Sequence, residues 1–236
     1  MSAAKKTVKT AAKKAVKKKR ILIVDDHPMM REGLAHSLNQ EPDLTVCGAA
    51  RTVDEALAGL AAQQPDLVLT DITLPGKSGL ELIKDLKAMH PALPVLVVSM
   101  HDEALYAERA LRAGARGYIT KEAAGEKLLH AIRQVLAGQI YVSEKAAAHI
   151  VAVFAGQPAT GGRAAVGLLS DREFEVFQLL GQGLATEQIA KRLHLSPKTV
   201  ETHRVHIKKR LGLATAPELT AYAARWAAAE TAAPAS

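Results

Sequence analysis

Residues 21–26 read ILIVDD and residues 67–71 read LVLTD, so two short, mainly apolar runs end in aspartate. Short runs rich in aliphatic residues are typical of strands that a parallel sheet buries on both faces. Similar runs occur at residues 44–47, 95–98 and 117–119. The aspartates would therefore lie where buried strands end.

Segments with the periodicity of amphipathic helices separate these runs. They lie at residues 28–39, 53–62, 79–89, 103–112 and 125–137. Strict alternation of strands and helices predicts a parallel sheet covered by helices on both faces. We therefore expect an α/β domain with a parallel five-stranded sheet over residues 21–140.

The second half of the chain has a different pattern. Residues 155–168 (AGQPATGGRAAVGL) have the composition of a linker and predict a hinge. Helical segments follow without an intervening strand, at residues 171–181, 186–193, 197–210 and 216–229. The expected order is thus an α/β domain, a linker over residues 141–167 and an all-α domain over residues 168–230.

The positive charge of the chain is concentrated at its beginning. Residues 1–20 hold nine basic residues and no acid, so the net charge of +7, less the tail's +9, leaves −2 for residues 21–236. Like charges predict a disordered tail, which is either simply solvated or an arm that contacts phosphates. No run approaches the roughly 18 apolar residues of a membrane span. The single cysteine, Cys47, fits a reducing cytoplasmic location and allows no intramolecular disulfide.

Polar side chains gather at one predicted sheet edge. Asp25 and Asp26 end the first strand, Asp71 the third and Ser99 the fourth, and Lys121 follows the fifth. The carboxyl ends of parallel strands share an edge, and carboxylates crowded there repel one another unless a cation joins them. Oxygen ligands favour Mg²⁺ over zinc. The alternative is that each polar residue only closes a strand or caps a helix.

The order DD, D, S and K at successive strand ends resembles that of the receiver domains of bacterial response regulators. The resemblance covers about residues 21–138. It implies a flavodoxin-like (βα)5 fold in which Asp71 accepts a phosphoryl group from a sensor histidine kinase. It also implies that Asp26, Asp71 and the backbone carbonyl of Thr73 bind Mg²⁺, with Asp25 acting through water.

The same resemblance assigns roles around the phosphoryl group. Lys121 would neutralise the phosphoryl oxygens and Ser99 would donate a hydrogen bond to one of them. Tyr118 would be an aromatic rotamer switch, although an ordinary half-buried strand residue is the alternative. Thr73 and His101 stand at positions that tune the lifetime of the phosphoryl group, with a plain exposed loop histidine as the alternative for His101.

Residues 196–211 read SPKTVETHRVHIKKRL and predict a helix with two distinct faces. Ser196 followed by Pro197 is a strong helix start, because serine accepts from free N–H groups and proline fits the first position. The stripe expected to face the core consists of Val200, His203, Ile207 and Leu211. The residues opposite are Lys198, Glu201, Thr202, Val205, Lys208 and Lys209.

The motifs LSDRE, QIAKRL, SPKTVETH and KKRLGL, within residues 168–228, resemble the LuxR-type helix-turn-helix of the NarL/FixJ group. The resemblance implies a four-helix LuxR/GerE-type domain whose recognition helix, 197–209, enters the major groove. Ala185 stands where a capping Ser or Thr is common, and Thr186 offers a cap one residue later. Expected base contacts are Glu201, Thr202 and Val205, and expected phosphate contacts are Thr199, Lys208 and Lys209.

Together these features predict a phosphorylation-dependent transcription regulator that binds promoter DNA as a homodimer. Its own phosphorylation and dephosphorylation would be its only chemistry. A phosphatase of the haloacid-dehalogenase kind also uses a strand-end aspartate and Mg²⁺, but it needs a second acid where this chain has Thr73. A quorum-sensing LuxR protein shares the helix-turn-helix and lacks the acidic strand ends.

Overall fold

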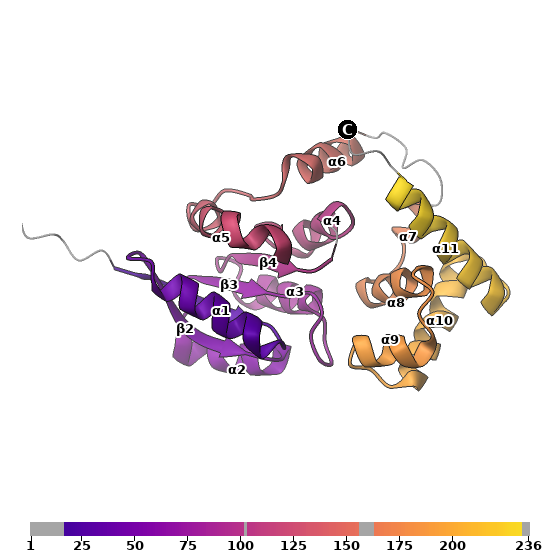
Figure 1. Cartoon of the computed structure of the whole chain (residues 1–236), viewed down its shortest axis with the longest axis horizontal. Coiled ribbons are helices and arrows are strands. Elements are labelled where there is room, and N and C mark those ends of the chain that lie inside the picture. Colours follow the sequence, from indigo (N-terminus) through magenta and orange to yellow (C-terminus); the bar gives the residue numbers. More distant parts are fainter. Residues whose placement is uncertain (1–16, 102, 156–162, 233–236) are drawn as a thin grey trace, which may run out of the picture.

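The computed structural model describes residues 17–101, 103–155 and 163–232, which form an α/β lobe and a helical lobe (Figure 1). The α/β lobe alternates strands and helices: β1 (Lys19–Val24), α1 (Pro28–Asn39), β2 (Leu44–Ala50), α2 (Val53–Gln63), β3 (Leu67–Thr70), α3 (Gly79–Met89), β4 (Val95–Ser99), α4 (Glu103–Ala113), β5 (Gly117–Thr120) and α5 (Lys121–Leu136). All five predicted strands are confirmed.

The sheet is parallel throughout, with the strand order β2-β1-β3-β4-β5. Successive residues of β1 point to opposite faces. Leu22 and Val24 join the core beneath α2, α3 and α4, whereas Ile21 and Ile23 join the core beneath α1 and α5. Burial on both faces explains why the strands are nearly continuous apolar runs. The flavodoxin-like receiver fold is confirmed.

Several boundaries differ from the sequence expectation, such as the end of β2 at Ala50 rather than at residue 47, and two of the differences have a clear local cause. Strand β1 begins at Lys19, inside the predicted tail, because Lys19 N–H donates to Asp43 O at 2.8 Å. Helix α5 begins at Lys121 rather than at residue 125, because the Thr120 hydroxyl caps it by accepting from Ala123 N–H. The remainder of the predicted tail, residues 1–16, lies outside the described residues.

The predicted linker contains two helices that sequence reasoning missed, α6 (Glu144–Phe154) and α7 (Arg163–Val166). Helix α6 packs on α4 (Figure 1), and Ala146 is buried in that contact. Ser143 N–H donates to Glu103 Oε1 at 2.7 Å, which ties the start of α6 to α4. Alanine is the strongest helix former, so the Ala-rich composition here favours a helix. Most of the predicted hinge, residues 156–162, lies outside the described residues.

The helical lobe contains α8 (Asp171–Gly181), α9 (Thr186–Arg192), α10 (Pro197–Leu211) and α11 (Ala216–Ala232). Val200 and Ile207 of α10 are buried, as the stripe predicted, while His203 and Leu211 are half-buried. The Trp226 ring packs on Phe177 with ring centroids 5.5 Å apart, so the apolar face of α11 turns inward. The all-α second half is confirmed, and no described helix is long and apolar enough to cross a membrane.

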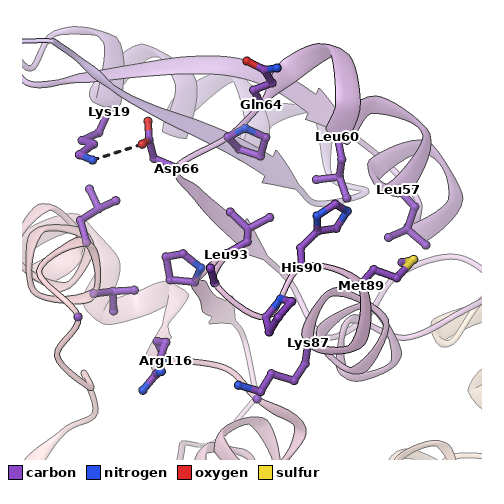
Figure 2. Close-up of a pocket in the computed structure, with 18 of the residues that line it drawn as sticks. Lys19, Leu57, Leu60, Gln64, Asp66, Lys87, Met89, His90, Leu93 and Arg116 are labelled. Carbon is purple, nitrogen blue, oxygen red and sulfur yellow. Dashed lines mark hydrogen bonds and ion pairs between the residues drawn. The ribbon is translucent and has the colours of Figure 1, made fainter.

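A groove of about 1100 Å³ lies at the amino ends of the strands (Figure 2). Leu60 and Leu93 line it together with Lys87, His90 and Arg116. The acidic strand ends lie at the opposite edge of the sheet. This groove is therefore remote from the predicted phosphoryl chemistry.

Candidate functional site

Asp71 follows β3 and is almost completely buried, yet both of its carboxylate oxygens have partners. Lys121 Nζ lies 2.7 Å from Oδ2, and Ser99 Oγ donates to Oδ1 at 2.7 Å. The backbone N–H of Ile72 donates to Oδ1 at 2.6 Å. Residues from the ends of three different strands therefore converge on one carboxylate, as the sequence predicted.

Asp25 and Asp26 complete the acidic rim, a name used here for Asp25, Asp26, Asp71, Ser99 and Lys121. Lys121 Nζ also lies 2.7 Å from Asp25 Oδ2, so one ammonium group bridges two carboxylates. Asp25, Asp26, His27 and Asp71 offer ligand atoms that all lie within 4.8 Å of one another. Three carboxylates at this spacing fit a hard divalent cation such as Mg²⁺.

Lys121 stays charged at this rim. Burial lowers the pKa of its ammonium group, but the charge of Asp71 and the hydrogen bonds to Asp25 and Asp71 outweigh burial and raise the pKa above its ordinary value. Only 4% of the Lys121 side chain is exposed. A fixed cation therefore faces the atoms of Asp71 where negative charge would accumulate.

Gly79 allows the loop after Asp71 to close against its own strand. Its N–H donates to Ile72 O at 2.7 Å, and a Cβ atom at this position would lie only 1.9 Å from Asp71 O. Ser78 begins α3 with a capping box to Glu81. The loop between Asp71 and α3 is therefore closed tightly against the end of β3.

The predicted switch residues lie in one chain of contacts. The Thr73 hydroxyl lies 2.8 Å from His101 Nε2, and Tyr118 Oη donates to His101 O at 2.9 Å. The Tyr118 ring is fully buried rather than half-buried. His101 is partly buried, and burial lowers the pKa of its imidazole although Asp71 opposes that shift. The loop after β4 is thereby connected to both Thr73 and β5.

The helical lobe docks against the acidic rim. His194, in the turn between α9 and α10, places Nε2 3.0 Å from Asp26 Oδ2. Its φ of 53° is a strained value for a non-glycine residue. His27 Nδ1 lies 2.8 Å from the other oxygen, Asp26 Oδ1. Asp26, a predicted metal ligand, is thus held between two imidazole rings.

Further contacts join the two lobes beside this point. Arg172 donates to Gly76 O at 2.8 Å, and Lys84 Nζ lies 2.6 Å from Asp171 Oδ2. The Arg109 guanidinium lies 3.9 Å from the centroid of the Phe174 ring. Residues of α3, α4 and the loop after Asp71 therefore all contact α8.

The predicted DNA-contacting residues share one accessible side of α10. This outward face of α10 comprises Lys198, Thr199, Glu201, Thr202, Val205, Lys208 and Lys209, all exposed or half-buried. Val205 is 56% exposed, although it is a large apolar residue. Docking of the helical lobe leaves this face accessible.

Sequence reasoning missed three side chains that contact these sites. His27 and His194 were not predicted as site residues, because isolated histidines have no distinctive spacing. Thr186 was expected to cap α9, but that expectation was wrong. Ala185 occupies the cap position, and the Thr186 hydroxyl instead donates to Glu201 Oε1 at 2.7 Å.

Both halves of the chain match established families. Residues 21–133 match the response regulator receiver domain, and residues 167–223 match the bacterial regulatory proteins of the luxR family. The oxygen regulatory protein NreC of Staphylococcus carnosus (strain TM300) is 36% identical over 208 residues, covering 86% of this chain and 96% of that protein. NreC of Staphylococcus aureus (strain JH9) is 37% identical over 208 residues and covers the same shares of the two chains.

Solved structures of the same kind are also similar. A LuxR-family two-component response regulator from Aurantimonas sp. SI85-9A1 has a TM-score of 0.55 and 34% identity, covering 58% of this chain and 99% of that one. RcsB of Salmonella enterica serovar Typhimurium, bound to promoter rprA in the presence of the phosphomimetic BeF3-, has a TM-score of 0.59 and 25% identity, covering 88% and 98%. The chain therefore belongs to the response regulators of the NarL/FixJ group, which join a receiver domain to a LuxR-type DNA-binding domain.

Proposed function

We propose that this protein is a phosphorylation-dependent transcription regulator of a two-component system. A sensor histidine kinase donates a phosphoryl group to Asp71, and the helical domain binds promoter DNA. The observation that carries the proposal is the Asp71 carboxylate, held between the Lys121 ammonium and the Ser99 hydroxyl at 2.7 Å each. A buried nucleophile with a fixed cation beside it suits phosphoryl transfer.

In this proposal Mg²⁺ is held by Asp26, Asp71 and the backbone carbonyl of Thr73, with Asp25 acting through water. The close spacing of the three carboxylates supports this set of ligands. When bound, the metal neutralises charge on the phosphoryl oxygens. His27 lies in the same cluster, where its imidazole orients Asp26.

The transfer step uses residues of the acidic rim. An Asp71 oxygen forms a bond to phosphorus while the phosphorus–nitrogen bond of the donor's phosphohistidine breaks. The leaving imidazole keeps the electron pair and takes up a proton. Lys121 faces the phosphoryl oxygens, and Ser99 exchanges its hydrogen bond with Asp71 for one with a phosphoryl oxygen. Tyr118 responds because its hydroxyl is bonded to the loop that follows Ser99.

The docked arrangement of the helical domain uses Asp26, one of the proposed metal ligands. His194 occupies one oxygen of this carboxylate in the docked arrangement, so metal binding and docking compete for the same group. If Asp26 held the metal, the metal would compete with His194 for this carboxylate and would shift the population toward free helical domains.

The outward face of α10 supplies the proposed DNA contacts. Lys208, Lys209 and Thr199 contact phosphates, Lys198 adds charge near the helix start, and Glu201, Thr202 and Val205 face base edges. Solved RcsB complexes with DNA support this use of the fold, and one contains two RcsB dimers bound to two parallel DNAs. We infer that this chain also pairs as a dimer on half-sites about one helical turn apart.

The proposed function also assigns the domain boundaries. We assign residues 21–140 to the receiver domain, 141–167 to the linker and 168–230 to the DNA-binding domain. Turnover of a separate phosphate ester is not part of the proposal, because the hydroxyl of Thr73 stands where a phosphatase of the haloacid-dehalogenase kind needs an acid.

Selection of bound DNA fragments, with and without a small phosphodonor and Mg²⁺, tests the function. We expect one sequence repeated at a spacing of about one helical turn, enriched more strongly when both are present. Equal enrichment under all conditions would remove the phosphorylation switch. No enrichment would remove sequence-specific DNA binding.

A further inference from the structure

Glu201, on the outward face of α10, is held by a closed triangle of hydrogen bonds. Thr186 Oγ1 donates to Glu201 Oε1 at 2.7 Å, and Arg204 Nη1 donates to the same oxygen at 2.9 Å. Arg204 Nη1 also donates to Thr186 Oγ1 at 2.6 Å. Thr186 begins α9, so the triangle links the two helices of the helix-turn-helix.

The triangle has an inner and an outer side. The Arg204 side chain is 17% exposed and the Glu201 side chain 54% exposed, so the cation lies beneath the carboxylate. Within the part of the chain that the structure describes, Glu201 Oε2 accepts no hydrogen bond and has no ion-pair partner. One oxygen is therefore occupied and the other is available on the outward face.

This arrangement changes what a glutamate can do near DNA. A free glutamate samples many rotamers and is repelled by phosphates, whereas this one is fixed by Thr186 and partly neutralised by Arg204. Its remaining oxygen can only accept. In the major groove, cytosine N4 and adenine N6 donate, whereas guanine presents acceptors and thymine an acceptor and a methyl group.

We propose that Thr186 and Arg204 are positioning residues that make Glu201 select cytosine or adenine, and reject guanine and thymine, at one position of the DNA site. The proposal rests on the proposed DNA-binding function of α10 and extends it to two side chains outside the expected contact set. A single acceptor oxygen does not distinguish cytosine from adenine. Rejection comes from facing a base acceptor with an unpaired carboxylate oxygen.

Selection of bound fragments from random duplex DNA tests the proposal on the full chain. Thr186→Val removes the hydroxyl at nearly constant volume, and Thr186→Ser retains it. Arg204→Gln removes the cation and is a second way to open the triangle. Thr220→Val is the matched control, because the Thr220 hydroxyl donates to the backbone Ala216 O of its own helix, α11, and has no other hydrogen bond among the described residues.

We expect wild type, Thr186→Ser and Thr220→Val to prefer cytosine or adenine at one position by roughly tenfold. Thr186→Val should remove the preference at that position alone, while the preferences at the other positions and the affinity for random duplex DNA change less than about twofold. Arg204→Gln should remove the same preference and also weaken the binding of all duplex DNA, because the charge of Glu201 is no longer neutralised. Such a change at one base pair is not expected from a general loss of stability. Circular dichroism of each variant checks folding.

Two results would overturn the proposal, and they are distinguishable. If the wild type enriches a site and both triangle variants retain the same preference at every position, the positioning role is wrong while the DNA-binding function stands. If the wild type enriches no sequence at all, the proposed function fails and the positioning role fails with it.

Discussion

The acidic rim and the outward face of α10 differ in how far their side chains are already partnered. In the rim, the Asp71 carboxylate lies against the Lys121 ammonium. The Asp26 carboxylate lies between two imidazole rings, one from each domain. On α10, Val205 and Lys209 face solvent although the domains are docked. In the proposed function, phosphorylation therefore need not uncover the proposed DNA contacts. It would instead exchange partners at the rim and free the helical domain to pair.

The largest effect is expected from the rim itself. Asp71→Asn should abolish labelling by a radioactive small phosphodonor, because the amide is not a nucleophile at this step. Asp66→Asn is the matched control, since Asp66 lies in the groove at the opposite edge of the sheet. Retained labelling of the Asp71 variant, with its circular dichroism unchanged, would move the phosphorylation site elsewhere.

A pair of variants separates the two faces of α10. Ile207→Ala should lower the free energy of unfolding of the helical domain by about 2–5 kcal/mol, because it leaves a cavity in the core. Val205→Ala should change it by less than about 0.5 kcal/mol but weaken DNA binding. Urea denaturation measures the free energy of unfolding of both variants. Similar losses of stability would show that the two faces had been assigned incorrectly.

Replacing His194 tests whether Mg²⁺ binding and docking of the helical domain compete for Asp26. His194→Asn keeps a residue that tolerates positive φ and removes the partner of Asp26 Oδ2. We expect Mg²⁺ to bind roughly fivefold more tightly, which corresponds to the loss of one hydrogen bond worth about 1 kcal/mol. Calorimetric titration of the full chain measures this, with His206→Asn as control. An unchanged dissociation constant would mean that docking and metal binding do not compete.

The smallest effect concerns a single phosphate contact. Lys209→Ala should weaken the dependence of DNA affinity on salt concentration. The slope of log affinity against log salt concentration should fall by about one unit, equally for all sequences. Lys127→Ala, an exposed lysine on α5, should leave the slope unchanged. Fluorescence anisotropy at a series of salt concentrations measures both. Equal slopes for Lys209→Ala and wild type would remove Lys209 from the interface.

Most of the fold was predictable because its signals are local. The apolar strands, and the Ser196-Pro197 start of α10, are encoded by neighbouring residues. The five rim residues could be assembled because strand ends of a parallel sheet share an edge. Helix α6 was missed because all of residues 141–167 were assigned to the linker, although only residues 155–168 have linker composition. The contacts of His194 and Thr186 depend on how two elements pack, which no single stretch of sequence reveals.

In the proposed function, the acidic rim controls DNA binding. The most direct test is the affinity of wild type and of Asp71→Asn for a selected DNA site, each with and without phosphodonor at constant Mg²⁺. We predict that the phosphodonor tightens binding by wild type about tenfold or more and leaves Asp71→Asn unchanged. An equal response of the two proteins, or no response from the wild type, would contradict it.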